Sequence, residues 1–222
     1  MPAVRDWGLR GYDEALGEMR QLRAARRRDE IPDTLLLVEH PPVITVGVQG
    51  SDGEELPAGL PVFHVERGGK STYHGPGQLV GYPIVDLQRR GRDVRRFIGD
   101  VEELVVRSLA EVGLSAGRVD GRRGVWVGGS RKIASVGVAI EEWVSFHGFA
   151  LNVSNDLSVF GRFHPCGFDG SVMTSVEKEL GREVPLALLR GGVRRAWGTL
   201  FDETTSRGPA PAPSDGLAVT AS

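Results

Sequence analysis

Apolar residues recur at the spacing of a helix in three segments of the chain. Residues 12–28 carry them on one stripe, and residues 93–112 do the same, with Asp93 as a suitable N-cap and Gly113 at the end. Pro185 favours the start of a last helix over residues 186–200, and a short helix is expected over 174–180. The pattern therefore predicts three long helices and one short one.

Strand-like apolar runs occupy much of the remaining sequence. His40-Pro-Pro42 separates the first two runs, because proline cannot continue a hydrogen-bonded ladder. The predicted strands are 34–39, 43–48, 62–66, 79–86, 124–127, 132–140 and 143–153. Helices and strands together predict an α+β fold: a single domain over residues 1–202, with a mixed β-sheet flanked by helices. Residues 203–222 are rich in Pro, Ala and Ser without periodicity, which predicts a disordered tail.

The composition is that of an ordinary globular protein, with 222 residues of which 40% are hydrophobic and 25% charged. No apolar run approaches the roughly 18 residues of a membrane span, and no basic segment followed by an apolar stretch indicates a secretion signal. The single cysteine cannot form an internal disulfide, which is typical of a reducing compartment. We therefore expect a cytoplasmic protein that does not bind membranes.

The charged residues narrow the classes of partner and ligand. A net charge of −2 gives no indication of nucleic-acid binding. The five histidines lack the close spacing of zinc ligands, so no metal is expected. The basic residues are 24 arginines and only three lysines, Lys70, Lys132 and Lys178. In a chain whose basic residues are nearly all arginine, a lysine suggests a function that arginine cannot perform, such as giving up its proton.

A segment rich in glycine, residues 67–78, is the first candidate for a site. It has four glycines in twelve residues and leads directly into a predicted strand, as suits a backbone that something must approach closely. Its spacing fits neither a P-loop nor a dinucleotide-binding turn. A plain tight loop is the alternative, but the dense polar set favours a site: Arg67, Thr72, Tyr73, His74 and Gln78.

The second candidate is Cys166, in Phe163-His-Pro-Cys-Gly-Phe168. A lone cysteine is usually a small buried apolar residue, yet this one lies outside any apolar periodicity and between Pro and Gly, as at an accessible turn. A free thiol has a pKa of about 8.5, so a nucleophilic role needs a cation or base nearby. The candidates are His74, His147, His164 and Lys132. Lys132 follows a Gly-rich hairpin turn at the start of a predicted strand, where a solvated charge is the alternative.

Several motifs, in order, resemble those of the lipoyl(octanoyl) transferases. They run from about Leu35 to Leu180, and the block Thr72–Gln78 is the most specific of them. The motifs are Arg67-Gly-Gly, Thr72-Tyr-His-Gly-Pro-Gly-Gln-Leu-Val-Gly-Tyr-Pro-Ile84, Gly124-Val-Trp126, Lys132-Ile-Ala, Ser135-Val-Gly137, His147-Gly-Phe-Ala-Leu-Asn152, and Pro165-Cys-Gly167 followed by Thr174-Ser175.

This resemblance implies the fold of the biotin and lipoate protein ligases and a transfer that needs no cofactor. An octanoyl or lipoyl group would pass from acyl carrier protein, through a thioester on Cys166 activated by Lys132, to a lysine of a lipoyl domain. Acceptors would be lipoyl domains of 2-oxoacid dehydrogenase complexes or the glycine cleavage H protein. The implied acyl site comprises Arg67, Gly68, Gly69, Lys70, Ser71, Thr72, Tyr73, His74, Ser135, Val136, Gly137, Gly148, Phe149 and Ala150.

Three other functions remain open on the residues. An ATP-dependent lipoate or biotin ligase would share the fold, but it needs no cysteine, and the Gly-Arg-Gly-Arg phosphate loop of biotin ligases is missing. A non-catalytic binder of acyl groups would have no use for both Cys166 and Lys132. A cysteine hydrolase would need a histidine with an orienting partner, which the sequence does not identify. Arginine-rich stretches at 89–96 or 118–131 would either dock an acidic carrier or be solvated surface.

Overall fold

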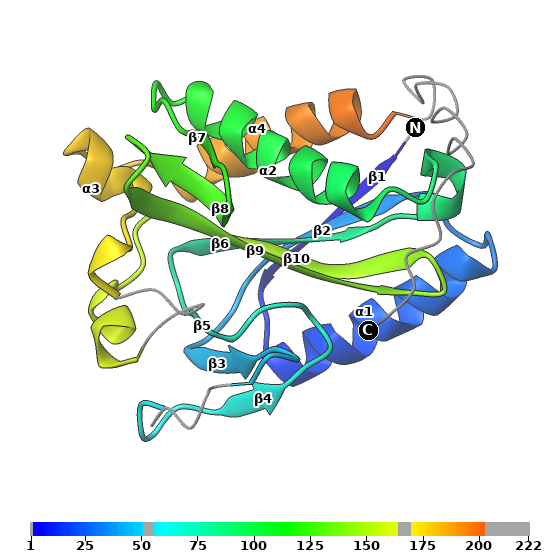
Figure 1. Ribbon diagram of the computed structural model, residues 1–222, viewed down its shortest axis with the longest axis horizontal. Coiled ribbons are helices and arrows are strands. Elements are labelled where there is room, and N and C mark those ends of the chain that lie inside the picture. The colour runs from blue at the N-terminus through cyan, green and yellow to red at the C-terminus, as the bar shows by residue number, and fades with distance from the viewer. Residues whose placement is uncertain (1, 51–55, 164–169, 203–222) are drawn as a thin grey trace, which may run out of the picture.

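The computed structural model describes residues 2–50, 56–163 and 170–202. Its centre is a seven-stranded sheet in the order β1-β2-β6-β10-β9-β8-β7 (Figure 1). The β1–β2 pair is parallel and the other neighbours are antiparallel, so the predicted mixed sheet is confirmed. The strands are β1 Ala3–Leu9, β2 Thr34–Glu39, β6 Gln78–Ile84, β7 Gly117–Val119, β8 Arg122–Val127, β9 Arg131–Glu141 and β10 Val144–Asn152.

Helices cover both faces of this sheet. Helix α1 (Tyr12–Arg27) lies on one face, and α2 (Val94–Ala110) and α4 (Leu186–Leu200) lie side by side on the other (Figure 1). The packing of β2 explains why its four central residues, 35–38, are all apolar. Leu35 and Leu37 pack in the core under α2 and α4, whereas Leu36 and Val38 pack against α1. Both faces of β2 are buried, so alternation with polar residues is lost.

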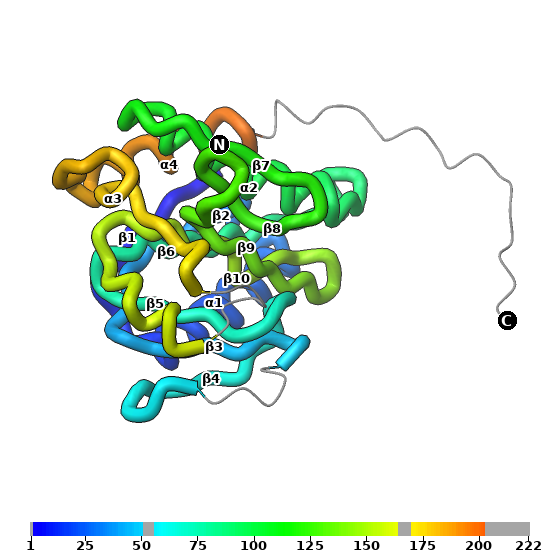
Figure 2. The backbone as a smooth tube through the Cα atoms, turned by 60° about the vertical axis from the view of Figure 1, so that its left-hand side comes forward, coloured from blue at the N-terminus to red at the C-terminus, as the bar shows by residue number. Residues whose placement is uncertain are grey.

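A second, three-stranded sheet of order β4-β3-β5 stands beside the main one. Its strands are β3 Val43–Val46, β4 Val62–His64 and β5 Ser71–His74. This small sheet packs with the short 3₁₀ helices η2 (Ser158–Arg162) and η4 (Gly170–Val172), coloured yellow in Figure 2. Two further short helices are η1 (Leu87–Arg90) and α3 (Val176–Leu180). In the part of the chain that the structure describes, no helix is long and apolar enough to cross a bilayer.

The helix predictions agree with the structure to within two residues, including the short helix, which begins at Val176. Asp93 is the predicted N-cap of α2, and its side chain accepts a hydrogen bond of 2.9 Å from the Arg96 N–H. The strand prediction was incomplete, because β1, β5 and β7 were not foreseen. Strand β5 lies inside the Gly-rich segment, and its residues become a strand only through pairing with β3. The predicted tail, 203–222, lies outside the described residues.

Candidate active site

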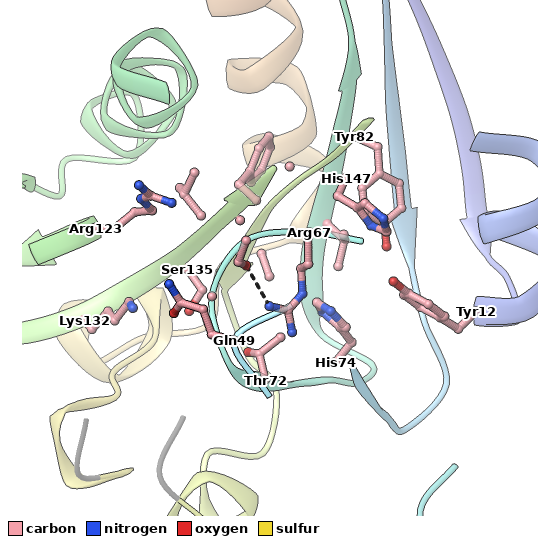
Figure 3. A pocket seen from close by; sticks show the side chains of 18 of the residues that line it. Tyr12, Gln49, Arg67, Thr72, His74, Tyr82, Arg123, Lys132, Ser135 and His147 are labelled. Carbon is pink, nitrogen blue, oxygen red and sulfur yellow. Dashed lines mark hydrogen bonds between the residues drawn. The ribbon is translucent and has the colours of Figure 1, made fainter. Parts of the chain in front are cut away.

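A cavity of about 320 Å³ opens between the Gly-rich segment and strands β9 and β10 (Figure 3). Two of the implied motifs meet in its wall as cross-strand partners: Ser135 faces Ala150, Val136 faces Phe149, and Gly137 faces Gly148. All six residues line the cavity, as do Lys132 and the following residues of the Gly-rich segment: Arg67, Gly68, Gly69, Thr72 and His74.

Along β5, successive side chains of the Gly-rich segment alternate between the cavity and the opposite side of the strand. Thr72 and His74 line the cavity, whereas Ser71 and Tyr73 do not. Tyr73 instead packs in the small core, with its ring 5.7 Å from the ring of Phe160. Successive side chains of a strand point to opposite faces, so a continuous block of residues cannot all face one ligand. Lys70 does not line the cavity either, and its carbonyl accepts a hydrogen bond from Arg67.

Arg67 is largely buried and holds the loop in place. Its guanidinium donates hydrogen bonds to the carbonyls of Thr45, Gly68 and Lys70, at 2.7, 3.1 and 2.7 Å. The loop lies close on β9, because the Gly68 N–H donates to the Val138 carbonyl at 2.9 Å. A Cβ at Gly137 would lie 2.9 Å from the Gly68 carbonyl oxygen, so a side chain there would push the loop away.

His74 belongs to a buried chain of hydrogen bonds that crosses the site. Its Nδ1 donates to Gln78 Oε1 at 2.8 Å, and Gln78 Nε2 donates to Asn152 Oδ1 at 2.9 Å. Asn152 in turn donates to the Thr174 carbonyl at 3.0 Å. Burial lowers the pKa of His74 to about 3, which keeps the ring neutral near pH 7. Its ring is thus a structural connector in this arrangement.

His147 is the second histidine of the cavity wall. It adopts a left-handed backbone conformation with φ 56°, which is uncommon outside glycine. Its Nε2 lies 3.3 Å from Glu66 Oε2, and burial lowers its pKa to about 4. Of the candidate activating groups, both His74 and His147 are therefore neutral rings engaged with other side chains, while His164 lies outside the described residues.

Lys132 is buried, with 2% of its surface exposed, so the alternative of a solvated charge at a strand end was wrong. Its Nζ lies 5.6 Å from the centre of the Trp126 ring, a distance typical of a cation–π contact. Its carbonyl accepts a hydrogen bond of 2.9 Å from the Thr174 N–H, and its backbone pairs with Met173 in an isolated bridge. The predicted nucleophile, Cys166, lies outside the described residues.

The sequence interpretation missed several residues of the cavity wall, among them Tyr12, Tyr82 and Arg123. Both tyrosines lie in apolar patterns and resemble ordinary core positions. Their rings surround histidines: Tyr12 stacks on His74 at 6.0 Å, and the Tyr82 hydroxyl donates to His40 Nε2 at 2.7 Å. These contacts between tyrosines and buried histidines join residues that are distant in sequence, so they become visible only once the strands are paired.

Comparisons with known proteins agree with this geometry. The model of the lipoyl protein ligase A/B catalytic domain matches residues 12–195. An octanoyltransferase of Geobacter metallireducens is 46% identical over 200 residues, which are 90% of this chain and 93% of that protein. An octanoyltransferase of Rubrobacter xylanophilus is 51% identical over 189 residues, covering 81% and 84% of the two chains.

Solved structures show the same fold at much lower identity. Lipoate-protein ligase A bound with ATP superposes with a TM-score of 0.67 at 17% identity, covering 90% of this chain and 84% of that one. The biotin protein ligase of Aquifex aeolicus gives a TM-score of 0.52 at 9% identity, covering 92% and 72%. The expected relation in fold to both kinds of ligase is thus confirmed.

Proposed function

The chain belongs to the octanoyltransferases, within the family of the lipoyl protein ligase A/B catalytic domain, and on this premise we propose how it acts. It transfers an octanoyl or lipoyl group from acyl carrier protein to a lysine of a lipoyl domain, in 2-oxoacid dehydrogenase complexes or in the glycine cleavage H protein. A thioester on Cys166 is the intermediate, and Lys132 is the partner of that thiol. The catalytic domain is residues 1–202, and its location is the cytoplasm.

The observation that carries this proposal is a buried lysine in the wall of the cavity. Burying an ammonium group is costly, so a buried lysine calls for a function. As a cation, Lys132 would lower the pKa of a nearby thiol and favour the thiolate. Once neutral, it would accept a proton from the ammonium group of the incoming lysine. Arginine, the usual basic residue of this chain, can do only the first of these.

The cavity suits one medium-length acyl chain. Val80, Val136, Phe149 and Ala150 give it apolar walls, and its volume of about 320 Å³ lies at the lower end for small-molecule sites. His74 and His147 are neutral at pH 7, so they add no charge to these walls. Each methylene of the substrate that leaves water contributes about 0.8 kcal/mol, which favours octanoyl over shorter chains.

The reaction balances without an external energy source. The Cys166 thiolate attacks the thioester carbonyl, a new C–S bond forms, and the carrier leaves as its thiol. The acceptor amine then attacks the acyl-enzyme, the C–S bond to Cys166 breaks, and an amide forms as the ammonium proton leaves. The first step exchanges one thioester for another and the second is downhill. Backbone N–H groups of the Gly-rich segment would stabilise the oxyanion of each step.

Chain connectivity supports the pairing of Cys166 with Lys132. Cys166 follows Phe163 by three residues, so their Cα atoms are at most about 11 Å apart. Phe163 packs in the same small core as Met173, and Met173 pairs with Lys132. On the other side of Cys166, the Gly170 carbonyl accepts a hydrogen bond of 3.1 Å from the N–H of Met173, the residue that pairs with Lys132.

The acidic carrier is proposed to dock along residues 118–123 rather than 89–96. Within residues 89–96, Arg89 pairs with Asp29 at 2.7 Å and Arg90 with Asp33 at 3.1 Å. Arg118, Arg122 and Arg123 are exposed and have no carboxylate within 4.0 Å among the described residues. Arg123 also lines the cavity, so a carrier bound there would face the site.

Intact-mass measurement of the enzyme after incubation with octanoyl-carrier tests the proposal. The wild type should gain the mass of one octanoyl group, and hydroxylamine should remove it. Cys166→Ala should gain nothing, since it is the only thiol of the chain. An adduct of equal yield on Cys166→Ala would refute the nucleophile.

A second reaction separates transferase from ATP-dependent ligase. Octanoyl-carrier and a lipoyl domain are mixed with enzyme in the absence of nucleotide and Mg²⁺, with a parallel reaction that contains both. Transfer at equal rates is expected, because the substrate is already activated. A strict requirement for ATP with this donor would assign the chain to the ligases.

A further inference from the structure

A buried carboxylate on α2 stands out from the other acidic residues of that helix. Glu102 is 7% exposed and lies between the buried residues Val101 and Leu104. Its neighbour Glu103 pairs with Arg107 one turn away at 2.9 Å. Glu102 has no arginine or lysine within 4.0 Å in the described part of the chain, and its Oε1 accepts a hydrogen bond of 2.8 Å from the Gly124 N–H. A carboxylate is costly to bury, so its position needs a reason.

Gly124, whose N–H donates this hydrogen bond, lies on β8 next to an irregularity in the pairing with β9. Val125 pairs with Ala134 and Trp126 with Lys132, which leaves Ile133 as an extra residue on β9. Such a bulge re-aims the side chains around it. Gly124 has φ 110°, and a Cβ there would lie 2.5 Å from the Ala134 carbonyl oxygen. Only glycine fits this position without strain.

The same hypothetical Cβ would lie 2.9 Å from Lys132 Cε. The Gly124 backbone therefore forms one wall of the channel that holds the Lys132 side chain, and the Trp126 ring lies 5.6 Å from the Nζ. The Glu102 carboxylate accepts the hydrogen bond of the N–H of that wall. A contact thus runs from α2, through the β8 backbone, to the aliphatic part of the lysine.

We infer that Glu102 is a positioning residue for Lys132: by accepting the Gly124 N–H it holds the bulge that aims the lysine into the cavity. The inference rests on the proposed role of Lys132. Without the acceptor, the Gly124 peptide is free to turn, and the wall beside Lys132 Cε moves with it. A displacement of about 1 Å in a reacting group can lower a rate about 100-fold.

The single cysteine makes a direct test possible, because alkylation by iodoacetamide reports on Cys166 alone. The rate of alkylation is measured against pH for the wild type, Glu102→Leu, Glu102→Gln, Glu103→Leu and Lys132→Met, and octanoyl transfer is measured on the same samples. Glu102→Gln keeps a carbonyl oxygen to accept the Gly124 N–H. Glu103→Leu is the matched control, one position along the same helix.

Lys132→Met should raise the pH midpoint of alkylation toward about 8.5, the value of a free thiol. Glu102→Leu should move the midpoint in the same direction and lower transfer about 100-fold. Glu102→Gln and Glu103→Leu should match the wild type within a few-fold. All measurements are made well below each variant's thermal midpoint. If Glu102→Leu does not fold, Glu102→Ala replaces it, because it admits water to the Gly124 N–H.

A purely structural Glu102 would give a lower thermal midpoint with an unchanged alkylation profile, and that result would overturn the inference. Equal losses in Glu102→Gln and Glu102→Leu would overturn it too, because they would make charge, not the hydrogen bond, the decisive feature. An unchanged profile in Lys132→Met would refute the Cys–Lys pair itself, and the inference would fall with it. Failure of the inference alone is thus distinct from failure of the proposed mechanism.

Discussion

Lowering the pH from 7.5 to 5.5 should destabilise this fold, because three histidines are buried in it as neutral rings. Burial is the main cause in each case, lowering the pKa to about 4 for His40, about 3 for His74 and about 4 for His147. The hydrogen bonds of His40 agree with a neutral ring, since Nδ1 donates to the Arg10 carbonyl and Nε2 accepts from Tyr82.

The sign and size of the effect follow from proton linkage. The unfolded chain binds a proton on each of these three histidines below about pH 6.5, whereas the folded chain does so only near pH 4 for His40 and His147 and near pH 3 for His74. Stability is therefore full above pH 6.5 and falls as the pH decreases toward the folded pKa. At pH 5.5 each histidine favours the unfolded state by about 1.4 kcal/mol, so the three together should lower the free energy of unfolding by about 4 kcal/mol.

Urea unfolding at pH 7.5, 6.5 and 5.5 measures this directly. His40→Gln is the informative variant, because His40 does not line the cavity. It should remove about 1.4 kcal/mol of the pH dependence. His64→Gln is the matched control on β4, where the side chain is exposed, and it should leave the pH dependence unchanged. A loss of less than about 1 kcal/mol in the wild type between pH 7.5 and 5.5 would refute the reasoning, as would equal effects of the two variants.

Three further results are expected. Lys132→Arg should slow transfer to a lipoyl domain about 10²–10⁴-fold, because guanidinium cannot accept the ammonium proton, and normal rates in both half-reactions would leave only an electrostatic role. Asn152→Leu should lower the free energy of unfolding in urea by about 2–4 kcal/mol, since it removes bonds to Gln78 and Thr174, and a loss below about 1 kcal/mol would contradict this. Deleting residues 203–222 should leave activity and the thermal midpoint unchanged, and a drop of several degrees would show that the segment packs on the domain.

The elements that the sequence predicts well are those whose own pattern determines them. Helix α2 has a cap, an apolar stripe and a stop within one segment, and β2 contains four consecutive apolar residues, 35–38. Strands β1 and β5 lack such a pattern. β1 is a half-exposed edge strand, and β5 consists of Ser, Thr, Tyr and His. Each becomes a strand through partners more than 20 residues away, Thr34 for Ala3 and Val46 for Ser71, which no local window contains.

The burial of Lys132 was unpredictable for the same reason. In the sequence it follows a turn and starts a strand, where a lysine is normally solvated. It is buried because Trp126 and Gly124 on β8 and Met173 beyond η4 close around it. The role of His74 was equally hidden, because its partner Gln78 is held by Asn152, 74 residues further along the chain.

The polar residues of the Gly-rich segment and its glycines depend on each other. Residues 67–78 are too polar to enclose an apolar chain unless their polar groups are satisfied elsewhere. Arg67 and His74 both line the cavity, but their polar atoms bond to protein partners: Arg67 to backbone carbonyls and His74 to Gln78. The glycines are then free to bring bare backbone to the cavity. A polar residue of this segment therefore acts on the substrate through the shape that it holds, and its replacement should raise KM for the octanoyl donor more than it lowers kcat.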